Sequence, residues 1–124
     1  MATYSTSDGQ RLTKSQIKSR TDKAVMEYRE DFVDDHGYQY CERTKVSNQK
    51  LDVSHIISVK YAQETGRAEL AWDKEHNMEL LIRSSHLAFE SLGNILREEW
   101  YHARMQGTSF EQFLNSLDDE SRFQ

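Results

Sequence analysis

The stretch that decides the fold is residues 51–90, LDVSHIISVKYAQETGRAELAWDKEHNMELLIRSSHLAFE. Its β-branched and apolar residues predict a strand with His55 at the end. A helix is expected from about residue 84, and it carries His86 and Glu90 four residues apart on one face. A helix that packs back on the strand brings His55 and His86 together.

These residue types suit hydrolysis assisted by a metal ion. A histidine and a carboxylate at four-residue spacing can hold a divalent cation from one side, while a second histidine takes a proton from water. The amide of Asn77, on the intervening loop, can hold the base or its backbone in place. Each residue also has an ordinary structural explanation, as a half-buried strand histidine, a loop-capping asparagine and a first-turn helix residue.

Upstream of the stretch, the sequence predicts a helix and then a hairpin. Residues 1–12 are small and polar and are expected to be flexible. Thr13 and Gln16 have the form of a capping box, which predicts a helix over 13–37 that ends at Gly37. Residues 38–57 predict two strands that flank the turn-forming SNQK at 47–50 and pair as a hairpin.

Downstream, a short helix from Val59 to near Gly66 is followed by an expected loop to Trp72. The apolar run 78–82 is too short to assign by periodicity. One long helix is predicted to end at Gly107, and a capping box at 108–111 opens a last helix. The long helix is expected to bury one face, formed by Leu87, Leu92, Ile95, Leu96, Trp100 and Ala103.

The composition favours one domain of the α+β class, with 124 residues and 10% aromatic residues. A net charge of -5 argues against a protein that coats nucleic acid non-specifically, so a nuclease of this composition needs a locally basic face. Cys41 is the single cysteine and no apolar stretch has the length of a membrane span, which predicts a reducing, cytoplasmic setting.

The strings VSHIIS, EHNMELL and IRSSH resemble, in order and spacing, the motif of HNH nucleases in the ββα-metal superfamily. The resemblance covers about residues 38–95 and implies a small ββα core flanked by N- and C-terminal helices, within a single HNH-like domain spanning 1–124. It implies a phage or mobile-element type endonuclease that hydrolyses DNA phosphodiester bonds. A protein partner that supplies specificity is a further expectation.

By this resemblance His55 is the general base and Asn77 orients it. His86 ligates a single Mg²⁺ or another divalent cation such as Mn²⁺, and Glu90 assists. Ser54 stands where the family usually has a stronger ligand, and Asp52 on the same strand face is a substitute. The residues expected to contact nucleic acid are Lys60, Arg83 and His76.

Many HNH domains also hold a structural zinc with two CxxC pairs. Of the four cysteines only Cys41 remains here, so no structural zinc is expected and Cys41 marks a relic position. These departures keep two alternatives open. One is a catalytically degenerate HNH-fold protein that binds nucleic acid or a protein, and the other is an acidic helical interaction protein.

Overall fold

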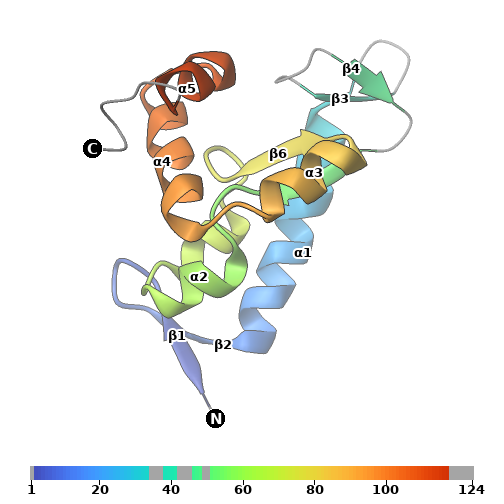
Figure 1. The fold of residues 1–124 in the computed structure, drawn as a ribbon. Helices are drawn as coiled ribbons and strands as arrows, with labels where there is room; N and C mark the ends of the chain where they lie inside the picture. The colour runs from blue at the N-terminus through green and yellow to red at the C-terminus, as the bar shows by residue number, and fades with distance from the viewer. Residues whose placement is uncertain (1, 34–37, 42–45, 49–50, 118–124) are drawn as a thin grey trace.

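The computed structural model describes residues 2–33, 38–41, 46–48 and 51–117 (Figure 1). The chain is α+β, as predicted. Its elements in order are β1 (Thr3–Ser5), β2 (Arg11–Thr13), α1 (Lys14–Asp31), β3 (Gln39–Cys41), β4 (Val46–Asn48), β5 (Asp52–His55), α2 (Val59–Glu64), the 3₁₀ helix η1 (Ala68–Trp72), β6 (Met78–Leu81), α3 (Arg83–Glu90), α4 (Asn94–Met105) and α5 (Phe110–Leu117).

The described strands form three antiparallel pairs, β1–β2, β3–β4 and β5–β6. The predicted hairpin over 38–57 is wrong, because β5 pairs with β6 and places His55 opposite Met78. Every residue of β6 is buried, which explains why its sequence shows no alternation. Residues 49 and 50 of the expected SNQK turn lie outside the described residues, and its first two residues are in β4.

The connection from β5 to β6 contains both a helix and a 3₁₀ turn. Helix α2 begins after the cap residue Ser58 and ends before Gly66, whose φ of 71° is the left-handed conformation that glycine adopts readily. The expected loop up to Trp72 is η1 instead. This connection lets β5, β6 and α3 form a ββα arrangement from residues far apart in the sequence.

Residues 3–13 form a strand pair that packs on the fold, whereas the sequence led us to expect a flexible segment over 1–12. β1 pairs with β2, and the turn between them binds the Glu69 carboxylate through the backbone N–H and hydroxyl of Ser7. Leu12 is buried in a small apolar cluster with Ile17 and two alanines of η1. The predicted capping box between Thr13 and Gln16 is confirmed, but α1 ends at Asp31, and Gly37 lies outside the described residues.

The predicted long helix is two helices. α3 ends at Glu90 and α4 starts after Gly93, and the break changes which side chains face the core. Leu87 and Ile95, expected in the core, are 58% and 76% exposed. The last helix has its capping box one residue later than predicted, between Ser109 and Gln112.

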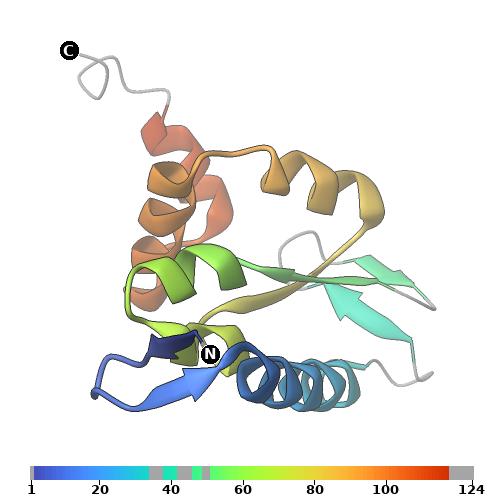
Figure 2. The same ribbon diagram turned by 90° about the horizontal axis from the view of Figure 1, so that it is seen from below.

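The β5–β6 pair lies between α1 on one side and α3 on the other (Figures 1 and 2). The main core fills the space around this pair and joins it to α4 and α5, where the Trp100 ring packs against Phe110 and Phe113. Burial of these aromatic rings is a major source of stability for so small a domain. In the described part of the chain, no helix is long and apolar enough to cross a membrane.

Candidate active site

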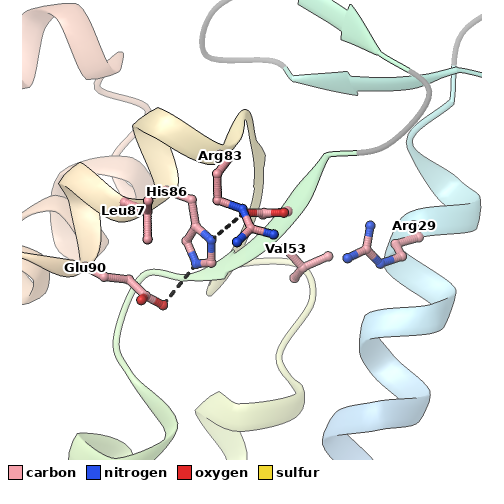
Figure 3. A pocket seen from close by; sticks show the side chains of 7 residues that line it. Arg29, Val53, Arg83, His86, Leu87 and Glu90 are labelled. Carbon is pink, nitrogen blue, oxygen red and sulfur yellow. Dashed lines mark hydrogen bonds and ion pairs between the residues drawn. The ribbon is translucent and has the colours of Figure 1, made fainter.

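A pocket of about 310 Å³ opens beside β5, where α1 and α3 approach it (Figure 3). Its lining is largely charged or polar and comes from three elements: Arg29 of α1, Asp52 and Val53 of β5, and Arg83, His86, Leu87 and Glu90 of α3. With His86 neutral, the two arginines and two carboxylates give the lining a formal charge of zero, whereas the whole chain carries -5. The lining therefore adds no net negative charge that would repel a phosphate.

His86 lies between two carboxylates. Its Nδ1 is 2.9 Å from Oδ2 of Asp52, and its Nε2 is 2.9 Å from Oε1 of Glu90, one turn further along α3. A protonated imidazole donates to both carboxylates. A neutral one donates to a single carboxylate and presents its second nitrogen to the other as a lone pair.

This arrangement contains a donor pair suited to a divalent cation. If Nδ1–H donates to Asp52, the Nε2 lone pair and the Glu90 carboxylate face each other at 2.9 Å. Two ligand atoms of one small cation, with bonds of about 2.1 Å, lie roughly 3.0–3.4 Å apart. The distance between Nε2 of His86 and Oε1 of Glu90 would therefore have to increase only slightly to admit the ion. Within the described residues no group of three or more His, Cys, Asp or Glu is arranged to hold a metal ion. The residues present therefore offer two ligands, and water and substrate oxygens would complete the coordination.

Asp52 lies against the imidazole of His86 and the guanidinium of Arg83, whose Nε is 2.7 Å from the same carboxylate oxygen. The hydrogen bond from His86 is the main cause that lowers the pKa of Asp52, and the Arg83 charge acts in the same direction. The carboxylate is thus ionised at neutral pH and fixes the orientation of His86. A carboxylate that binds the outer nitrogen of a histidine is a common arrangement beside metal sites.

His55 ends β5, as predicted, and its ring is fixed by one hydrogen bond. Its Nε2 lies 2.9 Å from the carbonyl oxygen of Ala71 in η1. A carbonyl only accepts, so Nε2 carries the proton and the neutral ring has its lone pair on Nδ1. Burial is the main cause that lowers the pKa of His55; the hydrogen bond to the Ala71 carbonyl opposes it, and the nearby charge of Arg97 acts in the same direction as burial. His55 is therefore neutral near pH 7, and it is not among the residues that line the pocket.

Asn77 is completely buried and bonds the backbone that follows His55. Its Oδ1 accepts from the Ile57 N–H at 2.8 Å, and its Nδ2 donates to the carbonyls of Ile57 and Leu70, both at 2.9 Å. The amide thus joins the end of β5 to η1, the element whose carbonyl binds the His55 ring. The Asn77 side chain thus bonds the backbone two residues after His55, and its role in orienting His55 stays a prediction.

Ser54 is also completely buried, and its Oγ has no hydrogen-bond partner in the described part of the chain. It stands opposite Glu79 in the β5–β6 register, and the Glu79 carboxylate accepts a hydrogen bond from the Trp100 indole. A buried hydroxyl without a partner costs about 1–3 kcal/mol. Ser54 therefore places a buried hydroxyl on β5 that does not line the pocket and has no contact that explains it among the described residues.

The residues expected to touch nucleic acid do not form one group. Arg83 lines the pocket and its side chain is 75% exposed. His76 lies before β6 and contacts Asp73, and Lys60 is exposed on α2. Cys41 is the last residue of β3, and its side chain lies outside the described part of the structure.

Two arginines at the site were not anticipated from the sequence. Arg29 reaches the pocket from α1 and donates to the Leu51 carbonyl just before β5. Arg97 is buried in α4 and donates to the carbonyls of His55 and Ile56. Its signal in the sequence is a charged residue three and four positions before Trp100 and Tyr101, on the buried face of a helix.

Comparison with known proteins returned no relatives: no family model matches the sequence, and no curated protein or solved structure is significantly similar to it.

Proposed function

We propose that this protein is a metal-dependent endonuclease of the HNH type that hydrolyses phosphodiester bonds in DNA. The observation that carries the proposal is the geometry of His55, whose Nε2 bonds the Ala71 carbonyl and whose Nδ1 has no hydrogen bond to the described residues, while burial lowers its pKa. The His86–Glu90 donor pair supports it, since both residues lie close enough to His55 to act on its pKa.

In the proposed reaction, Nδ1 of His55 takes a proton from a water molecule as the water oxygen forms a bond to phosphorus. The bond from phosphorus to the 3′-oxygen breaks, and that oxygen leaves with the electron pair and is protonated by solvent. Asn77 and the Ala71 carbonyl keep the ring in place during this transfer. Arg83 and Arg29 supply positive charge that favours binding of the phosphate.

A divalent cation held by His86 and Glu90 would stabilise negative charge on the phosphoryl group and the leaving oxygen. Asp52 orients His86 by accepting its Nδ1–H. Mg²⁺ commonly binds through one or two carboxylates together with substrate phosphates, so a site with few protein ligands is compatible with it.

The test is cleavage of supercoiled plasmid by purified protein with Mg²⁺, Mn²⁺ or EDTA, together with His55→Ala. The expected result is nicking that requires metal and falls by about 10²–10⁴-fold in the variant. His102→Ala is the matched control, because His102 is a 60% exposed histidine bound to Glu98 and should retain activity. Equal cleavage by His55→Ala and wild type would contradict the assignment of the base.

The second candidate function is binding of nucleic acid by a catalytically degenerate HNH fold. Ser54 favours it, because a buried hydroxyl replaces the stronger ligand of the resembling motif and leaves the site with two ligands from α3. This second function would be supported by a folded protein that raises the fluorescence anisotropy of labelled DNA but cleaves the DNA with neither Mg²⁺ nor Mn²⁺.

A further inference from the structure

The backbone just after β5 is held by side chains from other elements. Residues 55–57 are the last residue of β5 and the two that follow it, and the Ile56 N–H donates to the Asn77 carbonyl while the Asn77 amide bonds both polar groups of Ile57. The two remaining carbonyls, those of His55 and Ile56, accept from Nη2 and Nε of Arg97 at 2.6 and 2.8 Å. Arg97 thus bonds the backbone at His55 and Ile56, as the Asn77 amide bonds the backbone at Ile57.

Burial of the Arg97 guanidinium costs free energy. Its side chain is 8% exposed, its guanidinium lies 5.0 Å from the centre of the Phe89 ring, and burial lowers its pKa. Among the described residues the carboxylate that acts on it is that of Glu90, through space and without a hydrogen bond. A neutral donor would satisfy a carbonyl at less cost, but the rigid fork of a guanidinium can bond two successive carbonyls at once.

We propose that Arg97 is a positioning residue for His55: by bonding the carbonyls of His55 and Ile56 from α4, it fixes the backbone that directs the imidazole, with Nε2 on Ala71 and Nδ1 open. The groups around this ring are the Ala71 carbonyl of η1, Arg97 of α4, and His86 and Glu90 of α3. The effect on catalysis rests on the proposed function, whereas the effect on the ring orientation does not.

The first experiment therefore needs no nuclease activity. Side-chain ¹H–¹⁵N NMR of the full chain at neutral pH reports which nitrogen of His55 carries the proton. We expect the Nε2–H tautomer in the wild type and a shifted signal or a mixture of tautomers in Arg97→Gln. Arg97→Lys keeps the charge and one donor, so it should fold if Arg97→Gln does not, and should show a smaller change of the same kind.

Arg104→Gln is the matched control, because Arg104 is on the same helix and donates to the carbonyl of Met78, the residue paired with His55. It should lose stability without any change in the His55 signal. An unchanged His55 signal in folded Arg97→Gln, or failure of both Arg97 variants to fold, would overturn the proposal and make Arg97 a purely structural residue.

The second experiment measures plasmid or oligonucleotide cleavage by the same variants. Loss of positioning should lower kcat by about 10²-fold and leave KM within about twofold of wild type. A rise in KM with unchanged kcat would instead assign Arg97 to phosphate binding and contradict the positioning role. If the wild type does not cleave DNA, the NMR comparison still decides whether Arg97 orients His55, so the two failures are distinguishable.

Discussion

Replacing Asn77 with alanine should destabilise the whole domain, because its amide is fully buried and makes three hydrogen bonds to backbone. In the variant, the Ile57 N–H loses its acceptor and the Ile57 carbonyl loses its donor. The Leu70 carbonyl keeps a second bond, from the Asp73 N–H at 3.4 Å. Two buried groups are thus left without a partner, each at about 1–3 kcal/mol, which gives a loss of about 2–6 kcal/mol.

The measurement is urea unfolding followed by tryptophan fluorescence and circular dichroism. A loss of this size is a large part of the 5–15 kcal/mol typical of a small domain, so the midpoint should fall steeply or the variant should be unfolded. Asn94→Ala is the control, since Asn94 is exposed at the start of α4 and its loss should change stability by less than about 0.5 kcal/mol.

Asn77→Asp separates the roles of the two ends of the amide. It retains the acceptor for the Ile57 N–H but turns a carboxylate oxygen toward the carbonyls of Ile57 and Leu70. Burial and these carbonyls should raise the pKa of the new aspartate, so the variant should regain stability relative to wild type as the pH falls and the acid form donates.

A loss of less than about 1 kcal/mol in the free energy of unfolding of Asn77→Ala would refute the reasoning.

Two further predictions concern stability. Ser54→Ala removes a buried hydroxyl that has no partner in the described part of the chain, so the free energy of unfolding in urea should rise by about 1 kcal/mol; a fall would show that Ser54 has an unrecognised contact. Arg67 holds the Glu98 carboxylate at 2.6 and 2.8 Å, and these bonds lower its pKa below the usual 4.5. That contribution is present above the unfolded pKa and is lost as pH falls through the folded value. Between about pH 5 and 3 the wild type should therefore lose about 1 kcal/mol more than Glu98→Gln, and parallel pH profiles from thermal unfolding would contradict this.

Local signals in the sequence were sufficient for several elements. The capping box at Thr13 and Gln16 fixes the start of α1 within one turn, and Gly66 ends α2 through its own backbone preference. The four-residue spacing of His86 and Glu90 follows from helix geometry alone, and the structure brings the two side chains together. Such features depend on residues close in sequence, so they can be inferred without knowing the tertiary structure.

What could not be inferred depends on pairing at a distance. The partner of β5 is β6, more than twenty residues away, and nothing in the sequence of either strand selects it over the nearer β4. The break at Gly93 was missed because apolar residues continue on both sides of it with helical spacing. Arg97 escaped notice because its role depends on two carbonyls that carry no sequence information.

The order in which the chain is synthesised gives the segment 55–57 a further consequence. Both residues that hold its backbone, Asn77 and Arg97, are translated after it, and Arg97 comes after every residue of the His55, Asn77, His86 and Glu90 set. A chain that stops near residue 90 contains these four residues but lacks α4, and with it the hydrogen bonds from Arg97 to the carbonyls of His55 and Ile56. Since domains generally fold as units, such a fragment should, under the proposed function, be inactive until α4 is present.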